Sequence, residues 1–171
     1  MLGNSGFLAY KRSLLAEAES SCLEALDLAV ELGLKSGQAN IAYYLALIAL
    51  DRRNPAQALP YLRQALELSI DAHALHLTLQ AMHGYARYLA LVGQGEAAAA
   101  LLHFVINQPS YSSAARTRSE EVLGGVLADL TPQQRARAAR KAAEWPLEAF
   151  TEELRRLDAT SQETSGGKPS S

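Results

Sequence analysis

Three segments repeat one helical pattern at a spacing of 40 residues: AEAESSCLEAL (residues 16–26), PAQALPYLRQAL (55–66) and GEAAAALLHFVI (95–106). Each segment has an alanine, then an apolar residue four positions later and a third apolar residue seven positions later. These positions are Ala18, Ala58 and Ala98, then Cys22, Leu62 and Leu102, then Ala25, Ala65 and Val105. The spacing i, i+4, i+7 places all three on one side of a helix. We therefore predict three helices that each bury this face.

Small residues precede each of these segments at the same 40-residue spacing. They are Gly6, Ala46 and Ala86, followed three positions later by Ala9, Ala49 and Leu89. A small side chain lets two helix backbones approach closely. The sequence therefore predicts a helix before each segment, and an array of helix pairs is typical of a repeat protein.

Residues that start and stop helices agree with this register. Asn54-Pro55 places an N-cap before a proline at the first helical position, and Gln57 stands where a capping box has its reciprocal partner. Pro109 closes the third pair, and Ser112 or Ser113 can cap the next helix. We expect the glycines to fall in the breaks between helices: Gly33, Gly37, Gly93 and Gly95.

The pattern resembles the tetratricopeptide repeat family, in which the first helix has a small residue at its eighth position. The second helix of that family has alanine at the twentieth position and a small residue at the twenty-seventh. Matching positions here are Gly6, Ala46 and Ala86, then Ala18, Ala58 and Ala98, then Ala25 and Ala65, with Val105 as a larger variant. The pattern departs from the family in its period of 40 rather than 34 residues, in the lack of tryptophan at the fourth position and in the lack of a proline that ends the second helix. The resemblance implies an all-α fold, a right-handed α-solenoid of antiparallel helix pairs over residues 1–110, the first pair truncated.

Residues 111–158 are helical in pattern but fit the repeat poorly. Thr131-Pro132 is a strong helix start, which predicts helices over about 114–129, 132–144 and 147–158. Terminal repeats are atypical because they end the stack with a polar surface. We interpret this region as a C-terminal cap. Residues 159–171 are predicted to be a disordered tail because the stretch TSQETSGGKPSS has no apolar residue.

The opening LGNSGFLAYKRSLLAEAESSCLEALDLAVELG (2–33) and the pattern VLGGVLADLTPQQRARAARKAAEWPLEAFTEELRRL (122–157) support a second resemblance. They resemble the carboxy-terminal ends of large bacterial signal-transduction ATPases and transcriptional activators. Because the register places Met1 inside a first helix, we hypothesise that the chain is a fragment or a shortened relative of such a regulator. No GxxxxGK[ST] motif occurs, so nucleotide hydrolysis is not assigned to it.

Composition limits the range of functions and compartments. The formal net charge is −2, which gives no general attraction to nucleic acid or to an anionic membrane. One cysteine allows no internal disulfide, and the longest apolar run, residues 41–50, is half of a membrane span. We therefore expect a cytoplasmic protein that binds neither nucleic acid nor membrane.

The resemblance implies that first helices line a concave binding surface. Carried over by register, the residues that face it are Phe7 and Tyr10, then Asn40, Tyr43, Leu47 and Leu50, then Gln80, His83, Arg87 and Ala90. Amide, aromatic and cationic groups suit an extended peptide or a helix. The alternative is that these are ordinary solvated residues or contacts between repeats.

Other candidate sites have plainer explanations. His73, His76 and His83 share one helical sector, but only the first two are close enough to share an ion, so no metal or cofactor is predicted. Cys22 has a core position, where a thiol is a poor nucleophile. In RARAARKAA (135–143) the alanines Ala136, Ala139 and Ala143 are expected to pack while the charges face solvent.

No catalytic motif such as GxSxG, HExxH, GxGxxG or a paired CxxC is present, so we do not expect an enzyme. The prediction is a protein–protein interaction module that binds a peptide or helix of a partner, in bacterial signalling or transcriptional regulation. The alternative is a self-associating module, a homodimer through the exposed amino-terminal repeat. A third possibility is that a small ligand is sensed in the groove.

Overall fold

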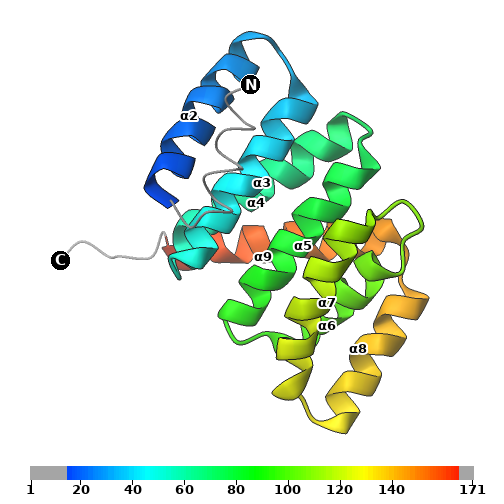
Figure 1. Ribbon diagram of the computed structural model, residues 1–171. Helices are drawn as coiled ribbons and strands as arrows, with labels where there is room; N and C mark the ends of the chain where they lie inside the picture. Colours follow the sequence, from blue (N-terminus) through cyan, green and yellow to red (C-terminus); the bar gives the residue numbers. More distant parts are fainter. Residues whose placement is uncertain (1–14, 166–171) are drawn as a thin grey trace, which may run out of the picture.

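The computed structural model describes residues 15–165, with side chains up to residue 157. In this part the chain forms only helices (Figure 1), which confirms the predicted all-α class. The helices are α2 (Leu15–Glu31), α3 (Lys35–Asp51), α4 (Pro55–Asp71), α5 (Leu75–Leu91), α6 (Gly95–Ile106), α7 (Ser113–Ala128), α8 (Pro132–Glu144) and α9 (Leu147–Ser165).

Helices α2 to α6 follow one another at a constant interval. Each of α2 to α5 has 17 residues, and each of the five helices begins 20 residues after the previous one. Each helix packs against the next. The 40-residue repeat of the sequence therefore corresponds to two helices and their two turns.

The four turns between these helices share one backbone conformation. The middle residue of each has a positive φ: 65° at Gly33, 55° at Arg53, 51° at His73 and 83° at Gly93. Its N–H donates to the carbonyl three residues earlier, and the next N–H donates to the carbonyl five residues earlier. This is the Schellman motif, which satisfies carbonyls that the end of a helix leaves free.

Two of the four glycines expected in breaks, Gly33 and Gly93, lie in these turns. The other two do not: Gly37 lies in the first turn of α3, and Gly95 is the first residue of α6. In the remaining turns Arg53 and His73 occupy the positive-φ position. A residue with a Cβ adopts this conformation only at a cost in free energy.

The repeated stripe forms the core, as predicted. All nine of its residues are at most 6% exposed: Ala18, Cys22, Ala25, Ala58, Leu62, Ala65, Ala98, Leu102 and Val105. The residues at the matching positions of the preceding helices are buried as well: Ala46, Ala49, Ala86 and Leu89. Gly6 and Ala9 lie outside the described residues.

Three side chains cap helices where the sequence placed caps. Asn54 accepts a hydrogen bond from the N–H of Gln57, and Ser112 accepts one from the N–H of Ala115. At α8, Thr131 and Gln134 form a complete capping box. The side chain of Gln57 departs from the expected box, because it donates to Glu19 of α2 at 3.2 Å and accepts from the side chain of Asn54 at 3.3 Å.

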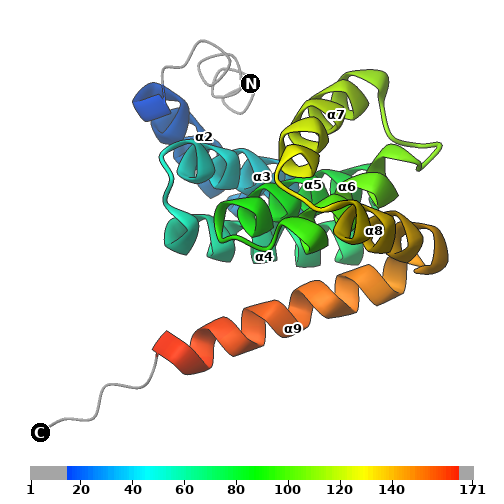
Figure 2. The same ribbon diagram turned by 90° about the horizontal axis from the view of Figure 1, so that it is seen from below.

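Of the three last helices, α7 and α9 flank the array, and α8 packs on α6 at its end. Figure 2 shows α7 on one side of the layer formed by α3 to α6 and α9 on the other. Arg116 holds α7 at the end of α6, because its guanidinium donates to the carbonyls of Ile106, Gln108 and Tyr111. Helix α9 runs back across α6 and α4: Phe150 lies 4.7 Å, centroid to centroid, from Phe104 of α6, and α9 also contacts α4.

Two expectations for this region need correction. Helix α9 continues to Ser165, seven residues beyond the end expected near residue 158; residues 166–171 lie outside the described part. In α8, the residues expected to pack are exposed: Ala136, Ala139 and Ala143. Ala138 is the buried residue of this helix, since α8 turns its other side toward α6.

Candidate functional site

Within the described region, the structure buries half of the side chains that were expected to face a partner. Tyr43, Leu47 and His83 are 3%, 5% and 4% exposed. They offer no open surface to a peptide, which corrects the expectation for these three residues. Leu50 is buried as well, at 5% exposure. The reason is tertiary, because α7 lies against the side of α5 on which His83 projects.

A buried polar cluster joins α7 to this surface. The hydroxyl of Ser119 lies 2.8 Å from Nδ1 of His83 and 2.9 Å from the hydroxyl of Tyr111. Burial, reinforced by the positive charges of Arg87 and Arg118, lowers the pKa of His83 to about 3. His83 is therefore a neutral hydrogen-bonding group that positions α7.

The other predicted concave-face residues of the described region are more open, and one of them is already engaged within the chain. Arg87 forms a 2.5 Å ion pair with Asp51 at the end of α3. Asn40 and Gln80 are half-buried. Phe7 and Tyr10 lie outside the described residues. The described members of the predicted set therefore do not form one continuous binding surface.

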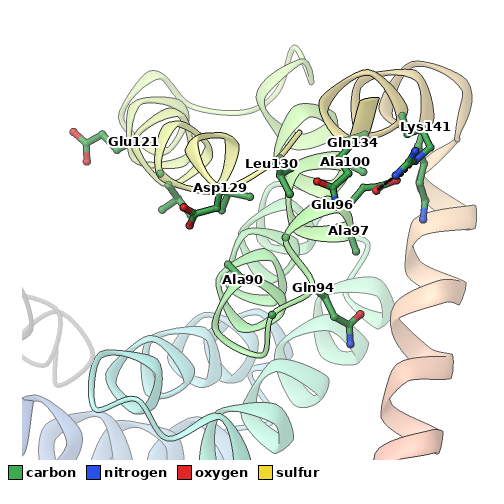
Figure 3. A pocket seen from close by; sticks show the side chains of 17 residues that line it. Ala90, Gln94, Glu96, Ala97, Ala100, Glu121, Asp129, Leu130, Gln134 and Lys141 are labelled. Carbon is green, nitrogen blue, oxygen red and sulfur yellow. Dashed lines mark hydrogen bonds and ion pairs between the residues drawn. The ribbon is translucent and has the colours of Figure 1, made fainter. Parts of the chain in front are cut away.

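An open cleft lies instead at the carboxy-terminal end of the array, with a volume of about 830 Å³. Helices α7 and α8 both pack on α6 and leave this space between them. Small and aliphatic side chains line much of it: Ala90, Ala97, Ala100, Val122, Val126 and Leu130. Figure 3 shows Leu130 near the middle, with Glu121 and Asp129 on one side and Glu96, Gln134 and Lys141 on the other.

The charges on the α8 side of the cleft are neutralised within the chain. Arg137 donates two hydrogen bonds to Glu96, at 2.8 and 2.7 Å, and thereby holds the pKa of the Glu96 carboxyl below its ordinary value. Lys141 pairs with Glu153 at 2.7 Å and lies 4.0 Å from the centroid of the Trp145 ring. This wall is held in place by its own ion pairs.

Two glycines lie inside α7 beside the cleft. Gly124 and Gly125 are both exposed, and a Cβ on either would meet no atom of the described chain within 4 Å. Only Gly125 lines the cleft. A glycine inside a helix costs roughly 0.5–1 kcal/mol relative to alanine, and packing among the described residues gives no reason for either one. Sequence reasoning missed this feature, although a glycine pair far from a helix end is a visible signal.

A smaller hollow of about 440 Å³ continues the cleft toward α3 and shares Ala90 and Val122 with it. The side chain of Arg53 and the Arg87–Asp51 pair line its far end. Together the two hollows run from α8, beneath α7, to the ends of α5 and α3.

The other candidates of the sequence are separated by the fold. His73 and His76 are exposed while His83 is buried, and the described residues contain no group of three His, Cys, Asp or Glu side chains that could hold a metal ion. Cys22 is fully buried, as predicted, and burial raises its pKa to about 11. Among residues 15–165, no helix is sufficiently long and apolar to cross a bilayer.

Comparison of the chain with protein-family models, with curated proteins and with solved structures gave no match. The candidate site is therefore defined by its own geometry.

Proposed function

We propose that this chain is a protein–protein interaction module that binds a helix or an extended segment of a partner in the cleft between α7 and α8. The observation that carries the proposal is the exposed Gly125 on the wall of this 830 Å³ cleft. A missing side chain with no neighbour in the chain leaves room for another backbone to approach. An open cleft with an apolar lining and polar rims is a usual form for a binding site.

The regular array supports the proposal that α2 to α6 form a right-handed, tetratricopeptide-like solenoid. In such a fold, stability is a sum of contacts between neighbouring repeats, and the surfaces of the array present residues to partners. The resemblance of the sequence to bacterial regulators supports a role in signalling or transcription. In this proposal the binding site is the cleft at the end of the array and not the concave surface that the first helix of each pair was expected to line.

A matched pair of variants tests the cleft. Gly125→Leu places a large side chain on the cleft wall, while Gly124→Leu places the same side chain one residue away, outside it. We expect partners captured from cell extract by the intact chain to be lost with Gly125→Leu and retained with Gly124→Leu. Quantitative mass spectrometry of the captured proteins measures the difference. If both variants capture the same set as the wild type, the cleft is not the binding site.

Self-association is a second candidate, and one observation favours it. Five large aliphatic side chains are exposed on α2 and the turn that follows it: Leu23, Leu28, Val30, Leu32 and Leu34. Exposed apolar residues gathered in one region are typical of a contact surface. The dependence of the sedimentation coefficient on protein concentration tests this candidate independently of the cleft.

A further inference from the structure

Helix α2 presents an aliphatic stripe to solvent beside a row of carboxylates. Leu23 and Val30, 40% and 55% exposed, lie seven residues apart and so project from the same side of the helix. Glu24, Asp27 and Glu31 form the adjoining acidic strip, and the helix has no basic residue. Among the described residues no ion pair neutralises these three carboxylates; Glu24 accepts only a 3.5 Å hydrogen bond from Ser20.

Helix α8 presents the opposite kind of surface. Its exposed side carries Ala136, Ala139 and Ala143, which leave a shallow face without large side chains. Arg135 and Arg140 are exposed on either edge of this alanine face. Arg140 has no ion pair in the described part of the chain, and Arg135 only donates to the carbonyl of Leu130.

These two surfaces are complementary in shape and in charge. Long aliphatic side chains on one helix pack well against alanines on another, because the small residues leave space between the helices. Rows of opposite charge beside the apolar contact determine which helices pair and in which orientation. We propose that the exposed face of α2 in one copy of this chain docks on the alanine face of α8 in a second copy.

The contact joins different copies because the two helices lie at opposite ends of the molecule (Figure 1). It uses two different surfaces, so in a pair one copy keeps its α8 face free and the other keeps its α2 face free, and the association continues head to tail. An interface of one helix from each copy is small. We therefore expect reversible association that increases with protein concentration and weakens as salt screens the charges.

Sedimentation velocity on the intact chain over a concentration series is the primary measurement. The expected result is a weight-average sedimentation coefficient that rises continuously with concentration and falls when salt is added. A sedimentation coefficient that stays at the monomer value over the whole series overturns the proposal.

Charge exchange then identifies the surfaces. Variant one carries Glu24→Lys and Asp27→Lys on α2; variant two carries Arg135→Glu and Arg140→Glu on α8. Each alone places like charges opposite each other, so we expect self-association to weaken at least about tenfold. An equimolar mixture of the two variants brings opposite charges together again, and we expect it to associate.

A control with the same change in charge as variant one keeps the result for α2 specific. Glu120→Lys with Glu148→Lys alters two exposed carboxylates on α7 and α9, outside both surfaces. This control is expected to associate like the wild type. Association that survives in variant two indicates symmetric α2–α2 pairing and overturns the head-to-tail contact. A mixture of variants one and two that stays monomeric overturns it as well. Loss or retention of partners with Gly125→Leu has no bearing on these outcomes.

Discussion

Gly84 and Gly125 both lie inside helices, but their surroundings are opposite. A Cβ on Gly84 would lie 2.5 Å from Cδ2 of Leu62, which is fully buried on α4. A Cβ on Gly125 would meet nothing within 4 Å. The first glycine is required by the close approach of α5 to α4. The second has no structural requirement within the described chain.

Alanine substitution at these glycines therefore has opposite effects on stability. We expect Gly84→Ala to lower the free energy of unfolding by about 1–3 kcal/mol, because Leu62 has no free space to move into. We expect Gly125→Ala to raise it by roughly 0.5–1 kcal/mol through higher helix propensity. Urea denaturation of the two variants measures both. Effects of the same sign would contradict either the close contact at Gly84 or the open space at Gly125.

His83 makes the stability of the protein depend on pH. Burial keeps its pKa at about 3, far below the value near 6.5 of an unfolded chain. Between these values the unfolded state binds a proton that the folded state does not. The stability gained from the neutral ring is complete above about pH 6.5 and is lost as the pH falls from 6.5 toward 3.

We expect this loss to reach about 1.4 kcal/mol for each pH unit within that range. The side chain in His83→Gln keeps a hydrogen-bonding partner for Ser119 but does not titrate. The free energy of unfolding of the wild type should therefore decrease more steeply than that of His83→Gln between about pH 6 and 4. Carboxylates contribute equally to both proteins, so parallel curves would mean that the folded and unfolded pKa values of His83 do not differ.

At the scale of helices and turns, sequence periodicity predicted most of what is observed. The buried stripe, the three caps and the start of α8 at Pro132 all follow from local rules. The side of α8 that packs could not be predicted from local rules, because alanines lie on both sides of this helix and alanine is equally compatible with core and surface. The long extent of α9 was missed because its last residues are polar while its helix continues from a packed amino-terminal half.

The four Schellman turns provide a test at this scale. Two of them have glycine at the positive-φ residue, and two have Arg53 and His73 there. We expect His73→Gly to stabilise the fold by up to about 1 kcal/mol, since it removes the strain of a Cβ in this conformation. Gly93→Ala is the converse change and should destabilise by about 1 kcal/mol. Thermal unfolding of both variants measures the effects, and a lower melting temperature for His73→Gly would contradict the explanation.

At the scale of the whole molecule, α7 and α9 determine which faces of the array remain accessible. Helix α7 covers His83 on one side of the array, and α9 crosses α6 and α4 on the other side. Phe150 anchors α9 through Phe104 and is 2% exposed, while Arg155 forms a two-hydrogen-bond pair with Glu67. The Arg155 and Glu67 side chains are 41% and 42% exposed.

These two contacts of α9 should differ greatly in strength. We expect Phe150→Ala to cost about 3–5 kcal/mol, because it leaves a cavity beside Phe104. We expect Arg155→Ala to cost at most about 1 kcal/mol, because solvent and salt screen an exposed ion pair. Chemical denaturation of both variants provides the comparison. Equal effects would indicate that α9 is held by its charges rather than by its apolar contact.

The sequence by itself determined the helices of the array, their 40-residue period and the stripe that α2, α4 and α6 bury. These follow from contacts and hydrogen bonds between residues close in the chain, which periodicity and capping rules describe. Only the tertiary structure decided where the last three helices lie. Their positions depend on contacts between residues far apart, such as His83 with Ser119 and Phe104 with Phe150. For that reason half of the predicted concave residues in the described region became core, and the candidate site moved to the cleft beside Gly125.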